Sequence, residues 1–394
     1  MEICDKESCT GCGMCADICA NKAIIMKPDK YGFLYPELDE TKCKGCSLCQ
    51  EKCPMNCQAS EGNTVYKLYA AWNKDRLTRK NSSSGGVFSL LAKGVLSDGG
   101  IVAGVRWDEQ FHTYHCCIGK EADLHLLNGS KYVQSVTGNI YSIVKANLLK
   151  GKKVLFSGTP CQVHALLQYL GKSYEKLFTV DLVCHGVPSS DLFDRHLNEI
   201  MNGQKQDIKS VSLRYKKPCW SYGSVRVEAV DKPLYRKLTI EDAYFNLFNF
   251  SYSLRPSCHI CRYTNMHRNG DVTLADFWGY SPKSIKMRDY DRGVSCVLIN
   301  TGKGDRMFNK IKKELVYEES TINAAKQANQ SLAMPFAEPT DCKEFWKDYE
   351  DGMLVSNLNK KYISKPYTMP NAYGLRRLKR QYSWLYRKLF GKRS

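Results

Sequence analysis

Two cysteine runs near the N-terminus constrain the fold of this chain more than any other feature. Successive cysteines in each run are separated by two, two and three residues: Cys9, Cys12, Cys15 and Cys19 in the first run, and Cys43, Cys46, Cys49 and Cys53 in the second. This is the spacing of bacterial ferredoxins, in which three cysteines of a run hold one [4Fe–4S] cubane and the fourth holds the other. We therefore predict one cluster on Cys9, Cys12, Cys15 and Cys53, and a second on Cys43, Cys46, Cys49 and Cys19.

A zinc site or a disulfide knot is the structural alternative for these runs. Zinc sites need four ligands, which usually come as two separated pairs, and two ordered repeats of four fit this pattern poorly. Cys4 and Cys57 lie outside the ligand spacing, and we expect them to be ordinary cysteines.

Composition limits the class of protein. The chain has 394 residues and 19 cysteines, and it shows neither a signal peptide nor an apolar run of the length that spans a membrane. Because iron–sulfur ligands must stay reduced, these features favour the cytoplasm over a secreted disulfide scaffold. The formal net charge is +18, and no acidic residue follows Asp351.

Three regions are predicted along the chain: a ferredoxin-like module over residues 1–60, an α/β domain with a mixed sheet over 61–320, and a C-terminal extension over 321–394. The middle region alternates buried strands with amphipathic helices, which is typical of a parallel sheet flanked by helices. Strands are expected over 65–72, 101–107, 152–158, 176–183, 208–215, 224–230, 270–274 and 294–300, and helices over 87–96, 141–149, 163–170, 189–200 and 240–250.

A serine- and glycine-rich loop over 81–86 leads directly into the first of these helices. Ser83, Ser84, Gly85 and Gly86 would leave backbone N–H groups free at the positive end of the helix dipole, which suits a nucleotide phosphate. The alternative is that serine simply caps the helix.

Four further cysteines stand out. Cys161 and Cys184 follow the carboxyl ends of predicted strands, where ligands bind in open α/β sheets, and Cys258 and Cys261 form a Cys-x-x-Cys pair. They could hold a third [4Fe–4S] cluster. A zinc ribbon, a redox dithiol and buried free thiols remain alternatives, because cysteine connectivity cannot be derived from sequence.

Several of these motifs together resemble the coenzyme F420 hydrogenase/dehydrogenase beta-subunit family, which includes enzymes like 7-hydroxymethyl chlorophyll a reductase. The resemblance rests on five segments in order: 83–86, 129–135, 157–162, 183–189 and Cys258-x-x-Cys261 followed by 270–279. It covers the chain to about residue 300 and implies bound FAD and [4Fe–4S] clusters. It also implies flavin contacts from the serine–glycine loop and from Ser130, Lys131, Tyr132, Gln134 and Ser135, and a third cluster beside the flavin.

The function that this combination predicts is an iron–sulfur flavoprotein oxidoreductase. Electrons from a ferredoxin or another redox protein would pass through the clusters and FAD to a small two-electron acceptor, F420 or another molecule. Lys131 or His185 would supply a proton or stabilise negative charge. The alternative is a non-catalytic electron-transfer subunit of a larger hydrogenase, dehydrogenase or reductase.

The C-terminal segment has its own pattern. Basic residues there alternate with apolar residues at helical spacing: Leu375, Leu378, Tyr382, Leu385 and Leu389. Such a basic amphipathic helix suits an anionic membrane surface or an acidic partner, and the alternative is a helix packed on the body. Nucleic-acid binding is disfavoured, because the basic residues lie mostly in this one segment without a recognition motif.

Overall fold

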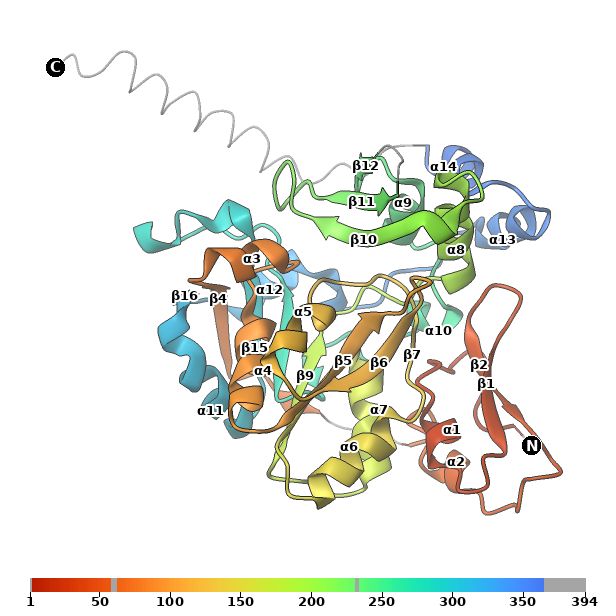
Figure 1. The fold of residues 1–394 in the computed structure, drawn as a ribbon, viewed down its shortest axis with the longest axis horizontal. Coiled ribbons are helices and arrows are strands. Elements are labelled where there is room, and N and C mark those ends of the chain that lie inside the picture. The colour runs from red at the N-terminus through yellow and green to blue at the C-terminus, as the bar shows by residue number, and fades with distance from the viewer. Residues whose placement is uncertain (1, 58–61, 231–233, 365–394) are drawn as a thin grey trace, which may run out of the picture.

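A nine-stranded mixed sheet forms the centre of the molecule, a computed structural model that describes residues 2–57, 62–230 and 234–364 (Figure 1). The strands, in spatial order, are β16 (Leu315–Glu319), β4 (Lys67–Asn73), β15 (Ser295–Ile299), β14 (Val272–Asp276), β9 (Leu177–Leu182), β8 (Val154–Gly158), β5 (Ile101–Trp107), β6 (Thr113–Ile118) and β7 (Ser135–Val136). The mixed α/β fold predicted from the sequence is confirmed.

The middle of this sheet is parallel. β14, β9, β8 and β5 are parallel neighbours, with Val154 opposite both Ile101 and Leu177. β15, β4 and β16 extend one side as antiparallel strands, and β6 pairs antiparallel with β5 at the other side. The carboxyl ends of the four parallel strands therefore lie along one edge, which is where such sheets bind ligands.

Helices cover both faces of the sheet. α4 (Val87–Ser97) and α11 (Gly302–Ile311) share a core with Leu155 of β8, whereas α6 (Ile140–Leu149) and α7 (Pro160–Leu170) share a core with Val154 and Phe156. Successive side chains of β8 thus enter opposite cores, as strand geometry requires. Because both faces are covered, the strands are apolar runs with little polar alternation.

The N-terminal module consists of α1 (Met14–Ile18), the hairpin β1 (Ile24–Pro28) and β2 (Leu34–Leu38), and α2 (Leu48–Glu51) (Figure 1). Met14 of α1 is fully buried in the core of α6 and α7. The Asp17 carboxylate accepts hydrogen bonds from the backbone N–H groups of Tyr141 and Ser142, at 2.9 and 3.0 Å. A negative charge at the N-terminus of α6 is favourable, so this contact holds the module on the body.

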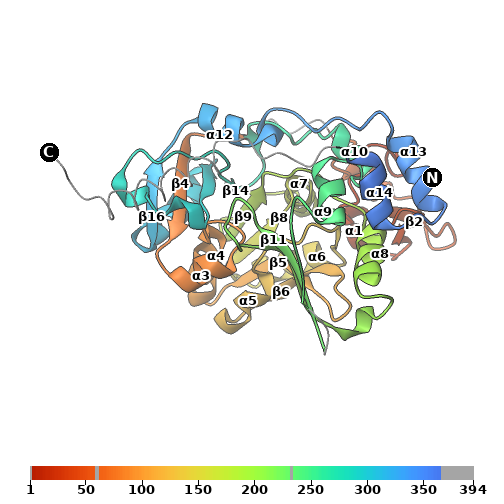
Figure 2. The same cartoon turned by 90° about the horizontal axis from the view of Figure 1, so that it is seen from above.

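A second layer lies over the carboxyl edge of the main sheet (Figure 1). It contains the sheet of β10 (Ile208–Tyr215), β11 (Ser224–Ala229) and β12 (Tyr235–Leu238), with α8 (Ser190–Ile200), α9 (Ala243–Asn249), α13 (Cys342–Glu350) and α14 (Val355–Tyr362). Phe345, Tyr349 and Leu358 of the last two helices are buried in one core with α8 and α9. Figure 2 shows α13 and α14 gathered beside α8 on the side of the module.

The hairpin of the N-terminal module also touches this layer. The Tyr31 ring lies 4.4 Å from the Trp346 ring, and the Lys30 ammonium pairs with Glu350 at 2.6 Å. Shorter elements complete the described fold: β3 (Asn63–Thr64), α3 (Arg76–Asn81), α5 (Leu124–Leu127), α10 (Pro256–His259), β13 (His267–Arg268) and α12 (Ile322–Ala328).

The predicted C-terminal amphipathic helix, with Leu375 through Leu389, lies outside the described residues. Among residues 2–57, 62–230 and 234–364, no helix has the length and apolar character needed to cross a membrane.

Candidate redox site

The first cysteine set, Cys9, Cys12, Cys15 and Cys53, lines one cavity of the N-terminal module. Gly11 and Gly13 between these cysteines have positive φ, at 65° and 72°, so the chain turns sharply around the cavity. The structure therefore brings together the four cysteines that the ferredoxin spacing assigns to one cubane. The donor set and the enclosed shape fit such a cluster.

Cys4 lines the same cavity, although the sequence pattern predicted an ordinary cysteine. Its thiol hydrogen-bonds with both Cys9 and Cys53. That contact is the largest cause lowering the pKa of Cys9 to about 6 and that of Cys53 to about 7. The Arg255 charge lowers the pKa of Cys9 further. Cysteine binds iron as the thiolate. The lowered pKa values of Cys9 and Cys53 therefore favour iron binding on their side of the cavity.

The second cysteine set is Cys19, Cys43, Cys46 and Cys49. Burial is the largest cause raising the pKa of Cys49, and repulsion from Cys19 and Cys46 raises it further, which places these three side by side. The backbone N–H groups of Ala23 and Gly45 donate to the sulfurs of Cys19 and Cys43, at 3.4 and 3.5 Å. Within the described ranges, no three His, Cys, Asp or Glu side chains meet the geometry of a single bound metal ion.

The third cysteine set, Cys161, Cys184, Cys258 and Cys261, assembles from segments far apart in the chain. Burial raises the pKa of every member, and repulsion from other members of the set adds to this for Cys184, Cys258 and Cys261. Cys161 lies in the first turn of α7, and Cys258 accepts a hydrogen bond from the Val187 N–H at 3.3 Å. The structure therefore brings the four thiols together, and four grouped cysteine sulfurs are a donor set that fits an iron–sulfur cluster.

The first and third sets are neighbours. Cys161 raises the pKa of Cys12 by charge repulsion, although burial is the main cause of its rise to about 12. Thr10, next to Cys9, hydrogen-bonds to Cys161. The first and third sets therefore lie close to each other at Cys12 and Cys161.

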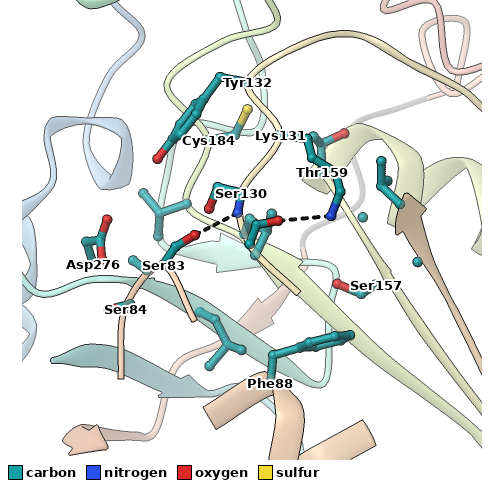
Figure 3. A pocket seen from close by; sticks show the side chains of 18 of the residues that line it. Ser83, Ser84, Phe88, Ser130, Lys131, Tyr132, Ser157, Thr159, Cys184 and Asp276 are labelled. Atoms are coloured by element: carbon teal, nitrogen blue, oxygen red, sulfur yellow. Dashed lines mark hydrogen bonds between the residues drawn. The ribbon is translucent and has the colours of Figure 1, made fainter. Parts of the chain in front are cut away.

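A cavity of about 310 Å³ adjoins the third set at the carboxyl edge of the sheet (Figure 3). Its walls come from the ends of β8, β9 and β14, from the start of α4, and from the loop over 127–133. Cys184 is both a member of the third set and a lining residue of this cavity. The volume lies within the range of small-molecule and cofactor sites.

Most of the predicted flavin residues line this cavity: Ser83, Ser84, Gly86, Ser130, Lys131, Tyr132 and Ser135. The helix α4 begins at Val87, with Gly86 at its cap in the left-handed region (φ 80°) and without a side-chain cap. Serine therefore does not cap this helix, contrary to the simpler alternative. Instead the Ser83 hydroxyl accepts from the Ser130 N–H at 2.6 Å, which joins the two loops (Figure 3).

Gly85 and Gln134 are not among the lining residues. A Cβ at Gly85 would lie 2.3 Å from the Ala71 carbonyl, so this glycine serves the close packing of the loop on β4 and β15. The Gln134 side chain turns to the N-terminal module, where its carbonyl accepts from the Leu34 N–H at 3.0 Å. The structure gives both residues a structural contact, and their flavin contacts stay predictions.

Lys131 and His185 both line the cavity, but in different charge states. Burial lowers the pKa of Lys131 to about 8, and its ammonium donates to the Asn128 and Gly129 carbonyls at 3.0 and 3.1 Å. Burial lowers the pKa of His185 to about 4, and its Nε2–H donates to the Phe248 carbonyl at 3.0 Å. At neutral pH only Lys131 presents a proton and a positive charge.

Phe88 and Asp276 are among the lining residues that the sequence did not single out as ligand contacts. Phe88 enters the cavity from α4, and Asp276 lies at the end of β14 (Figure 3). The Trp220 Nε1–H donates to the Asp276 carboxylate at 3.1 Å, and Arg214 approaches it at 3.4 Å. The signal for Asp276 was its position directly after a predicted strand.

Lys216 secures the serine–glycine loop from outside. Its ammonium donates to the carbonyls of Arg79, Ser84 and Arg292, and burial lowers its pKa to about 7. Its contacts come from three separate segments, so no sequence pattern could have revealed this role.

Comparisons with known proteins found two family matches, a curated relative and a similar solved structure. Residues 151–325 match the family described as the C terminus of the coenzyme F420 hydrogenase/dehydrogenase beta subunit, and residues 8–57 match the 4Fe-4S dicluster domain. The F subunit of the F(420)H(2) dehydrogenase of Methanosarcina mazei is 23% identical over 339 residues, which is 80% of this chain and 85% of that protein. A chain of the F420-reducing [NiFe] hydrogenase complex from Methanosarcina barkeri is 18% identical with a TM-score of 0.46, covering 80% of this chain and 100% of its own.

Proposed function

Because residues 151–325 belong to the coenzyme F420 hydrogenase/dehydrogenase beta-subunit family and follow a 4Fe-4S dicluster domain, we propose that this chain is an iron–sulfur flavoprotein oxidoreductase. It exchanges electrons between a ferredoxin-type redox partner and a small organic two-electron substrate. Coenzyme F420 is the first candidate substrate, since the family and the Methanosarcina mazei relative carry it in their names.

The observation that carries this proposal is the position of Cys184. It belongs to the third cysteine set and also lines the cavity, while Cys161 of the same set lies beside Cys12 of the first. The order of sites is therefore first set, third set, cavity. A path of this kind delivers single electrons to a cavity that holds a cofactor and a substrate.

FAD is the cofactor that we propose for the cavity, and a flavin supplies the conversion between one-electron and two-electron transfer. The uncapped N-terminus of α4, an 11-residue helix, faces the cavity through Val87, Phe88 and Ser89. Free backbone N–H groups there suit the phosphates of a dinucleotide. The side chains of Phe88 and Tyr132 add apolar wall for a flat ring system.

Lys131 is the residue that we propose for charge and proton control. Its pKa of about 8 keeps most of it protonated at neutral pH while leaving it able to release the proton. The Asn128 and Gly129 carbonyls hold its ammonium at the cavity wall. His185, neutral and with its Nε2–H already donated, contributes shape and packing against Phe248 and Phe336.

The second candidate is an electron-transfer subunit that needs a larger complex for turnover. It is favoured by the name of the Methanosarcina mazei relative, which is one subunit of a dehydrogenase. In that case the described sites stay the same, and a partner supplies the second substrate.

One assay separates the two candidates. The anaerobically purified chain is mixed with reduced F420 and a viologen dye, and dye reduction is followed. We expect turnover by the chain alone; turnover that starts only after addition of a co-purified partner supports the electron-transfer role instead. If neither condition gives turnover with reduced F420 or with reduced nicotinamides, the proposed oxidoreductase function is wrong.

A further inference from the structure

We propose that Arg255 is a positioning residue that sets the reduction potentials of two iron–sulfur centres together, those on the first and the third cysteine set. This inference rests on the proposed function, because both centres belong to it. It assigns a role to a residue that lies outside every cysteine motif and outside the flavin cavity.

Arg255 is connected to both sets by hydrogen bonds. Its backbone N–H donates to the Val187 carbonyl at 2.9 Å, and its carbonyl accepts from the Cys258 N–H at 2.8 Å. The side chain leaves this segment and reaches the module, where Nε donates to the Cys9 carbonyl at 2.6 Å. One residue thus holds a ligand of the third set by its backbone and a ligand of the first set by its side chain.

The guanidinium group of Arg255 is buried, but within the described part of the chain its two terminal nitrogens lack the hydrogen-bond partners that a buried charge needs. Arg255 has 0% exposure, and among the described residues neither terminal nitrogen makes a hydrogen bond of ordinary geometry. Its flat face lies 4.0 Å from the Tyr35 ring centroid, and a Cβ at Gly11 would lie 2.8 Å from one terminal nitrogen. One terminal nitrogen therefore lies against the cysteine loop of the first set, where hydrogen bonding from Arg255 helps to lower the pKa of the Cys9 thiol.

Arg268 provides the comparison within the same protein. It is equally buried at 1% exposure, but its three nitrogens donate to Thr273, to the Tyr263 and Asn265 carbonyls, and to the Leu182 carbonyl. Every side-chain nitrogen of Arg268 is therefore paired. Because an unpaired buried charge is strongly unfavourable, the terminal nitrogens of Arg255 fit an anionic group between the cysteines.

A cubane with four thiolates is such a group, since it carries net negative charge that grows on reduction. A fixed positive charge beside it stabilises the reduced form more than the oxidised form and so raises the reduction potential. Because the charge of Arg255 acts on Cys9 and on Cys258, we expect it to raise the potentials of both centres. One charge would therefore shift two neighbouring centres in the same direction.

The test is a redox titration of the anaerobically purified full chain, followed by electron paramagnetic resonance, with iron and sulfide measured in each sample. Neutral variants Arg255→Gln and Arg255→Met are expected to lower the potentials of both centres. At a fixed potential the ratio of reduced to oxidised cluster should fall about tenfold, which is about 59 mV for one electron. Arg79→Gln removes a buried arginine that donates to the Gly293 and Asp289 carbonyls and whose charged neighbours are Asp289, Arg292 and Asp291, and this change should leave both potentials unchanged.

Unchanged potentials in a neutral variant with full iron content would overturn the inference, as would a shift at only one centre. If neither neutral variant retains iron, Arg255→Lys decides: restored iron supports a role for the charge, and iron still missing contradicts it. Failure of the proposed function looks different, because the unmodified chain itself would then give no turnover in the dye assay, whatever the potentials of its clusters.

Discussion

Replacing Cys258 by serine is expected to remove about four iron atoms per chain and to reduce electron transfer into the cavity to background. Cys258 is held by Val187 and Arg255, and its thiol faces Cys261 and Cys161. Serine is a poor ligand for iron in such a site, and each cubane carries four irons. Bound flavin should be retained, because Cys258 does not line the cavity.

Iron analysis, the flavin absorption spectrum and the viologen assay together check this prediction. Cys219→Ser is the matched control, since Cys219 belongs to none of the three cysteine sets and lines neither cavity. Its iron content and turnover should equal those of the unmodified chain. If Cys258→Ser retained all its iron and its turnover, the third cluster would have to be abandoned.

Replacing Lys131 by methionine is expected to lower turnover by about a hundredfold to a thousandfold while flavin content stays normal. Losing one electrostatic or proton-donating group at a reacting centre typically has this effect. With a pKa of about 8, Lys131 is protonated below that pH and loses its proton above it. In the direction of electron flow that requires protonated Lys131, turnover of the unmodified chain should therefore fall above about pH 8.

The pH profile separates this role from a structural one. In Lys131→Met the alkaline limb should disappear, whereas Lys131→Arg should keep most turnover and move that limb to higher pH. Lys209→Met, at an exposed lysine of β10, should change neither rate nor profile. His185→Gln should have a smaller effect than Lys131→Met, because His185 is neutral over this pH range. If the alkaline limb persisted in Lys131→Met, the fall in turnover at high pH would have to come from a group other than Lys131.

The fold was predictable where one physical signal dominates. Strands with a clear apolar pattern, such as β5 and β10, were located to the residue. β6 was missed because Tyr114, His115, Cys116 and Cys117 give no apolar alternation, and its position is fixed by pairing with β5. The sequence does not predict α13 and α14. Their apolar residues, such as Phe345 and Leu358, are isolated in the sequence and are buried only by a core formed with distant segments.

In the candidate site, too, the residues that follow a local sequence pattern could be predicted, and those that depend on distant contacts could not. Cysteine spacing within each run is local, so the first and second sets could be predicted from the two runs, and the family resemblance pointed to the third set. Cys4 and Arg255 act through contacts with residues remote in the chain. Cysteine spacing alone cannot predict such contacts. Gln134 lies in the right loop, but its side chain faces the module.

Quantifying iron, sulfide and flavin in the anaerobically purified chain tests the electron path most directly. Three cubanes and one flavin predict about 12 iron atoms, about 12 sulfides and one FAD per chain. About 8 irons without flavin would leave only the N-terminal ferredoxin-like module and would contradict a path from the first set through Cys184 to the cavity.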